Sequence, residues 1–178
     1  TDFARDLGKT TMMSAQESAE AMSFLGMAGW DTTQIMAGLP NILNLTIASG
    51  RDFATVADIV SDNLTAFGMS ADESGRYTDA LAYAMSNANV NMDTLGESLK
   101  YIAPVASSAG FSMEETVSAV MALGDAGIKG SQAGTTLRTV MLNLTGANQK
   151  ATDKLKELGV AVFDSEGKTR SFADIIQD

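Results

Sequence analysis

The chain has 178 residues, of which 45% are apolar and 19% charged, so it can fold around a packed core. Its formal net charge is −10, and because an acidic surface repels phosphate backbones we expect no direct nucleic-acid binding. It contains neither Cys nor His, which excludes a disulfide framework and the Ser/His and Cys/His pairs of nucleophilic enzymes. We expect no enzyme, no cofactor and, without Asp-rich loops of EF-hand spacing, no metal site.

Helix signals fill the first part of the chain, up to Gly68. Met12–Met27 is rich in Ala, Met and Glu, and Ser14 and Glu17 have the spacing of a capping box, either at the start of this helix or inside it. Asp31–Ala48 opens on a similar Asp-Thr-Thr-Gln pattern, contains Pro40, which should kink or divide it, and ends before Gly50. Its apolar side chains recur three and four residues apart, on one helical face: Ile35, Leu39, Ile42 and Leu45. Asp52–Phe67 carries a similar stripe: Phe53, Val56, Val60, Leu64 and Phe67.

The same signals continue to residue 158. Capping-box spacings at Ser70–Glu73 and Ser112–Glu115 mark two helix starts. The expected helices run from Ser70 to about Ala88, Met92 to Ser108, Ser112 to Leu123, about Ser131 to Leu144, and Gln149 to Leu158. The sequence therefore predicts a mostly α fold, a bundle of helical hairpins over residues 1–158.

Residues 159–178 have a different pattern. Two short β-prone runs, Val160–Phe163 and Lys168–Phe172, flank the turn sequence Asp164–Gly167, which predicts a small β-hairpin. A last helix should start near Ser171. The chain has no initiator Met and stops within an apolar-patterned run, so we expect it to be a fragment of a longer chain.

The chain also contains an internal repeat of pattern. Gly50 and Gly110 are 60 positions apart, and apolar positions of the two surrounding helices coincide at the same offset, for example Ile35 with Leu95 and Val60 with Val120. We therefore expect two related helical hairpins, at about 30–68 and 90–128.

The sequence GIKGSQAGTTLR, from Gly127 to Arg138, resembles a phosphate-binding loop only superficially. A Walker loop has its lysine directly after the last glycine and follows a strand, whereas Lys129 precedes Gly130 and a helix is expected before it. The structural interpretation assigns Gly127 to a helix C-cap and Ser131 to the next N-cap. Gly134, inside a helix, then points to close helix packing or a special turn, either of which would offset its cost of up to ~1 kcal/mol.

The remaining candidate sites have structural explanations. The acidic pairs Asp72/Glu73 and Glu114/Glu115 lie in first helical turns, where they complement the helix dipole. Trp30 directly precedes a helix cap and is expected to act as a hydrophobic staple. Residues 32–50 carry no charge, but they include Asn, Gln, Thr, Ser and a proline, which is too polar a run for a membrane span.

The chain resembles the tape measure proteins of tailed phages, in their shared helical minor-tail region. The resemblance rests on Asp93–Leu144; it covers most of the chain and is specific in the second half. The resemblance is strongest over Ala109–Leu144, whose run GIKGSQAGTTLR looks like the family's signature turn and helix. The tail KELGVAVFDSEGKTRSFADII is similar to the family's small hairpin. We single out as structural or interaction residues Trp30, Gly50, Gly110, Gly127, Lys129, Gly130, Ser131, Gly134 and Arg138.

The resemblance implies a long helical structural protein that sets tail length during assembly and leaves the tail tube when DNA is ejected. It implies other copies of itself, tail tube proteins and assembly proteins as partners, a place inside the virion tail, and the host cytoplasm during assembly. The alternative is a membrane- or envelope-interacting helical module that aids DNA entry. Frequent helix breaks at glycines, prolines and capping residues favour a folded module over an extended ruler.

Overall fold

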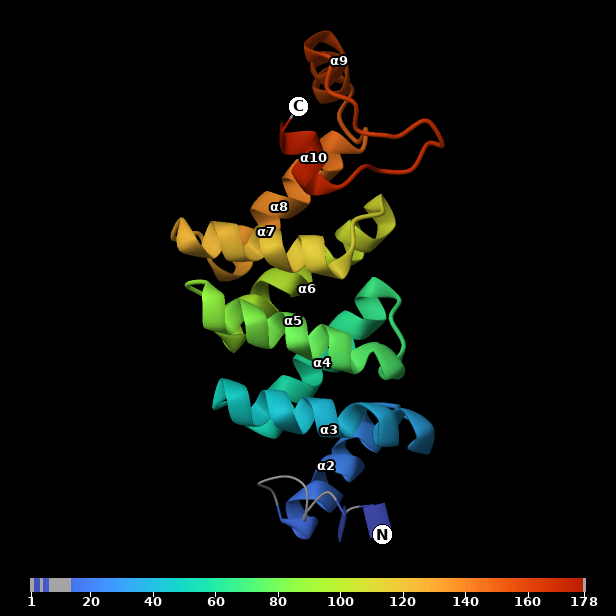
Figure 1. Cartoon of the computed structure of the whole chain (residues 1–178), viewed down its shortest axis with the longest axis vertical. Helices are drawn as coiled ribbons and strands as arrows, with labels where there is room; N and C mark the ends of the chain where they lie inside the picture. Colours follow the sequence, from blue (N-terminus) through green and yellow to red (C-terminus); the bar gives the residue numbers. More distant parts are fainter. Residues whose placement is uncertain (1, 4, 7–13, 178) are drawn as a thin grey trace. The chain divides into compact units, whose positions relative to one another are not determined.

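The computed structural model describes residues 2–3, 5–6 and 14–177, and the chain divides into two compact units, residues 1–86 and 87–178. Each unit is described by itself. The helices of the first are α2 (Ala15–Met27), α3 (Thr32–Ser49), α4 (Phe53–Phe67), the 3₁₀ turn η1 (Ala71–Glu73) and α5 (Ser74–Asn87). Those of the second are α6 (Met92–Ala109), α7 (Met113–Asp125), α8 (Gly130–Leu144), α9 (Gln149–Leu158) and α10 (Phe172–Gln177) (Figure 1). The mostly α prediction is confirmed; residues 12–13 of the first expected helix lie outside the described residues.

Several helices begin at the capping residues that the sequence indicates. In α2, α3 and α7 the N-cap side chain accepts the N3 amide and the N3 side chain accepts the N-cap amide, at Ser14, Asp31 and Ser112 respectively. Such boxes satisfy backbone donors that a helix start leaves unpaired. Ser70 opens the 3₁₀ turn, where its amide donates to Glu73 Oε2 at 3.0 Å, and α5 follows from Ser74.

Pro40 does not divide α3, which runs without interruption from Thr32 to Ser49. Leu39 and Ile42, which lie on either side of the proline, are fully buried in the same core. Burial of a Leu or Ile side chain contributes about 1.5–3 kcal/mol, so several such residues offset a cost of about 3 kcal/mol for an interior proline.

Each unit buries the apolar stripes that the sequence shows. In unit 1 the predicted stripe of α3 is buried and faces the apolar sides of α2 and α4, where Phe24 and Phe53 meet edge to face with ring centroids 5.9 Å apart. In unit 2 helix α6 packs against α7 and α8. Its buried residues include Leu95, Leu99, Ile102, Ala103 and Ala106.

The predicted C-terminal β-hairpin is wrong. Between α9 and α10 the structure has an isolated bridge, Phe163 with Thr169, and in the described part of the chain no strand forms (Figure 1). Two backbone hydrogen bonds connect the two β-prone runs. The Asp164 amide donates to the Lys168 carbonyl and the Arg170 amide donates to the Val162 carbonyl, each at 2.9 Å. An isolated two-stranded hairpin is marginal in water, and among the residues of these two runs Val162 alone is buried.

Candidate functional site

Helices α6 and α8 of unit 2 approach each other closely at Gly134. A Cβ atom at Gly134 would collide with the backbone carbonyl oxygen of Ser98 and would lie 2.9 Å from the Cβ of Tyr101. Because the first obstacle is backbone, it cannot rotate away. Gly134 is therefore required for packing, as its place in a helix suggested.

Ser98 holds this crossing together. Its side chain is fully buried, and its hydroxyl lies 2.7 Å from the Thr94 carbonyl oxygen of its own helix and 2.9 Å from the Gly130 carbonyl oxygen of α8. One hydroxyl proton shared between these two acceptors ties the start of α8 to α6. Sequence reasoning missed Ser98, because a serine inside a helix carries no signal of its own.

The rest of the glycine-rich stretch forms the turn into α8. Ala126 caps α7, and Gly127 follows with φ +86°, a left-handed conformation that allows the Ile128 amide to bond the Leu123 carbonyl at 2.8 Å. The predicted N-cap at Ser131 is wrong: α8 begins at Gly130, and Lys129 is the N-cap, without a side-chain hydrogen bond. The N-cap therefore lies two residues earlier than predicted, and Gly130, the first residue of α8, has the left-handed φ of +58° that glycine allows.

The charged residues of this stretch do not form a phosphate site. Lys129 is half-buried at the turn, whereas Ser131 and Arg138 are exposed on α8, which begins after a helix instead of a strand. In the described residues no three Asp, Glu, His or Cys side chains gather in a way that would hold a metal ion.

Unit 1 contains a related crossing that sequence reasoning also missed. A Cβ atom at Gly38 of α3 would collide with the ring of Trp30 and would lie 3.5 Å from the Ser74 hydroxyl of α5. Asn41 donates a hydrogen bond to that hydroxyl at 2.9 Å. Trp30 thus packs over Gly38, about one helical turn further along α3 than the residue that a hydrophobic staple would contact. The internal repeat was the available signal, since its offset pairs Gly38 with Ser98 and Ser74 with Gly134.

Gly50 and Gly110 end the two long helices α3 and α6. Both adopt left-handed conformations, with φ +65° and +83°, and their amides bond the last helical carbonyls. Nothing lies within 4 Å of a Cβ built on Gly50, whereas at Gly110 it would meet the Thr169 hydroxyl at 3.3 Å. Gly110 is therefore a helix end and also a contact of the C-terminal segment.

The C-terminal segment docks on the joint between α6 and α7. The Thr169 hydroxyl donates to the Ala109 carbonyl at 2.7 Å, and the Phe172 amide donates to Glu115 Oε1 at 2.9 Å. The rings of Phe111 and Phe172 meet edge to face at 5.8 Å. These contacts explain why the C-terminal segment does not pair fully with itself: part of its hydrogen bonding goes to the helices.

Glu115 caps two helices at once. Its Oε2 accepts from the Ser112 amide and hydroxyl in the capping box of α7, and its Oε1 accepts the first amide of α10. Partial burial and the nearby Asp174 raise the pKa of Glu115, but the hydrogen bonds from Ser112 and Phe172 outweigh them, and the net pKa is lowered. The charged form of Glu115 therefore stabilises this joint.

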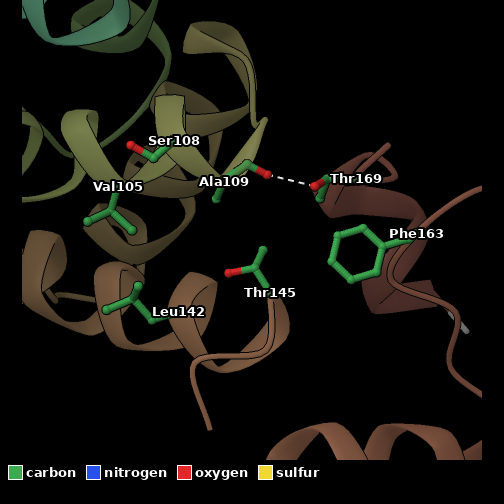
Figure 2. A pocket seen from close by; sticks show the side chains of 7 residues that line it. All are labelled: Val105, Ser108, Ala109, Leu142, Thr145, Phe163 and Thr169. Carbon is green, nitrogen blue, oxygen red and sulfur yellow. Dashed lines mark hydrogen bonds between the residues drawn. The ribbon is translucent and has the colours of Figure 1, made fainter. Parts of the chain in front are cut away.

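Two apolar grooves lie on either side of Phe163 in unit 2. The larger, of about 480 Å³, is formed by α6, α8 and the C-terminal segment, and Figure 2 shows Val105 and Leu142 on one side with Phe163 and Thr169 opposite. The smaller, of about 250 Å³, lies beside α9, and its lining includes Leu144, Leu155 and Lys156. Phe163 contributes to both, so the grooves are neighbours.

Comparison with known proteins identifies the family. The model of the phage-related minor tail protein family matches residues 1–178. The chain belongs to this family. It is 40% identical over 164 residues to the tape measure protein of Pneumococcus phage Dp-1, an alignment that covers 92% of this chain and 14% of that protein. It is 39% identical over 175 residues to the probable tape measure protein of Escherichia phage P2, with 98% and 22% covered.

The chain spans less than a quarter of the length of these two relatives. No solved structure matches it. The crossing at Gly134, the turn at Gly127 and the docked C-terminal segment all lie within the stretch matched by the minor tail family model. Family membership therefore fits the resemblance seen in Ala109–Leu144.

Proposed function

We propose that this chain is a folded helical module of a tape measure protein, which sets tail length during phage tail assembly and is released for DNA ejection. The single observation that carries the proposal is the near-full-length similarity to two phage proteins whose names are tape measure protein and probable tape measure protein. The parent protein would assemble with other copies of itself and with tail tube and assembly proteins, inside the virion tail and, before that, in the host cytoplasm.

The proposed role of this module is structural. Its buried residues are mostly apolar core, and the side chains that lie at its helix crossings are small: Gly38, Ser74, Ser98 and Gly134. Its carboxylates Glu17, Asp52 and Glu115 accept helix-cap hydrogen bonds. These are properties of a scaffold, and they support a non-enzymatic role.

The membrane-interacting alternative gains no support. The uncharged residues 32–50 form α3, whose apolar side chains are buried within unit 1. Among the described helices, none combines the length and apolar character that crossing a bilayer requires.

We further propose that the internal repeat seen in the sequence is also a repeat of the folded structure. The two left-handed glycines, Gly50 and Gly110, and the two N-caps Asp31 and Asn91 are separated by the same offset. The buried faces of α2, α5 and α8 follow it as well, as Ala21, Leu81 and Met141 illustrate. The repeat thus covers three helices instead of the hairpin alone.

Deletion of Gly50–Ala109 in the parent phage tests the proposal, because it removes one full repeat and joins α3 to the segment before α7. If the module were an extended ruler, tails would shorten by about 90 Å, from ~1.5 Å per helical residue. If it is folded, tails keep their length while assembly or infectivity falls. Electron microscopy of tails measures the difference. A shorter control deletion, Gly50–Leu99, breaks the repeat and should prevent folding.

A further inference from the structure

Charge is distributed unevenly along the chain. Residues 126–158, which form α8 and α9, contain five basic and two acidic residues, a net charge of +3. Residues 1–86, which form unit 1, contain four basic and eleven acidic residues, a net charge of −7. We call residues 126–158 the basic segment. Opposite charges on two parts of one chain favour contact between different copies of that chain.

The basic segment also exposes apolar surface. Helix α9 buries none of its residues: Leu155 is half-buried and Leu158 is 64% exposed. The smaller groove lies along this helix, and Phe163 beside it is 46% exposed. In a soluble protein, exposed apolar surface of this kind, rimmed by charge, is typical of a binding surface.

Two cations of α9 have no acidic partner among the described residues. Lys154 pairs with Glu157 at 3.0 Å, but Lys150 and Lys156 are exposed, and neither forms an ion pair in the described part of the chain. Lys156 lines the smaller groove. An incoming acidic surface would therefore meet Lys156 next to apolar side chains.

Unit 1 presents the complementary surface. Asp58 and Asp62 are exposed on α4, one turn apart, and no ion pair engages either among the described residues. Like charges at this spacing destabilise a helix, a cost that a facing cation removes. Unit 1 also exposes large apolar side chains, Met27, Met36 and Ile47.

We propose that the basic segment of one copy docks onto the acidic unit 1 of a second copy, head to tail. Because the two surfaces differ, a docked pair leaves one surface of each kind free, and association continues into a ring or an open row of copies. A nucleic acid fits less well, because the chain outside the basic segment has a net charge of −13 and repels it. This inference names the surfaces through which copies would meet, and it rests on the proposed function only for the choice of copies as partners.

Sedimentation velocity of the whole chain tests the docking. We expect concentration-dependent association at about 0.05 M NaCl that is lost near 1 M, where the Debye length falls to about 3 Å. The double variant Lys150→Glu/Lys156→Glu should weaken it by about tenfold, the equivalent of about 1.4 kcal/mol. Association that persists at high salt, or a monomer at every concentration and low salt, would overturn the proposal.

A matched control separates local docking from net charge. Lys100 is exposed on α6 and lies outside both grooves, so Lys100→Glu makes the same charge change as Lys156→Glu at another place in unit 2. Equal weakening of the self-association by Lys100→Glu and Lys156→Glu would contradict the proposal.

A charge swap tests the partner surface. The Asp58→Lys/Asp62→Lys chain should bind the Lys150→Glu/Lys156→Glu chain more tightly than either chain binds itself. No binding between these variants would also reject unit 1 as the partner. Each result leaves the tail-length experiment, and hence the proposed function, unaffected.

Discussion

Gly134→Ala is the substitution whose effect the structure defines most sharply. The added methyl group would strike the Ser98 carbonyl oxygen and press on the Tyr101 Cβ, so α8 must move away from α6. Forcing an extra methyl group into a packed interior costs about 1–3 kcal/mol, and a backbone obstacle places this case at the upper end. Alanine returns up to about 1 kcal/mol through its helix propensity. We expect a net loss of about 1–2 kcal/mol, the difference of these terms.

The matched control is Gly26→Ala in α2. A Cβ at Gly26 would have a single neighbour, Ile35 Cδ1, at 4.0 Å, so only the propensity gain remains. Urea unfolding followed by circular dichroism measures both variants, and in thermal unfolding each kcal/mol corresponds to about 2–4 °C at this chain length. We expect Gly26→Ala to raise stability and Gly134→Ala to lower it. Equal stabilisation by both would refute the close crossing of α6 and α8.

Three further predictions follow from named contacts. Tyr77 is fully buried, its hydroxyl has no hydrogen-bond partner among the described residues, and burial raises the pKa of this phenol. Tyr77→Phe should therefore raise the unfolding free energy, measured in urea, by about 1 kcal/mol. A loss of stability would show that the hydroxyl is hydrogen-bonded. Because the folded pKa of Glu115 is lowered below its ordinary 4.5, its stabilisation is present above about that pH and is lost as pH falls through the folded pKa. Glu115→Gln should therefore reduce the loss of unfolding free energy that occurs as the pH is lowered in this range. An unchanged acid dependence in this variant would show that Glu115 does not contribute to it. Thr169→Val removes the hydrogen bond to Ala109 and should cost about 1 kcal/mol while speeding hydrogen exchange of residues 160–177, whereas the same change at exposed Thr139 should not affect that segment's exchange.

The sequence by itself determined most of the helices and many of their ends. Capping residues at Ser14, Asp31 and Ser112, and glycines at 50 and 110, satisfy local hydrogen-bonding needs that depend on a few neighbouring residues. Apolar residues spaced three and four positions apart likewise identified most of the buried face of α3, because this spacing places their side chains on one side of a helix. The family resemblance in Ala109–Leu144 was also readable, since it rests on local motifs.

Only the tertiary structure decided which residues meet at the helix crossings. Ser98 and Gly38 gave no local signal, because their importance lies in atoms brought close from other parts of the chain, the Gly130 carbonyl and the Trp30 ring. The C-terminal runs had strand-like composition, yet Thr169 and the Phe172 amide bond to α6 and α7 and no sheet forms in the described residues. Local propensity is a preference of about 1 kcal/mol or less per residue, and packing against distant helices outweighs it.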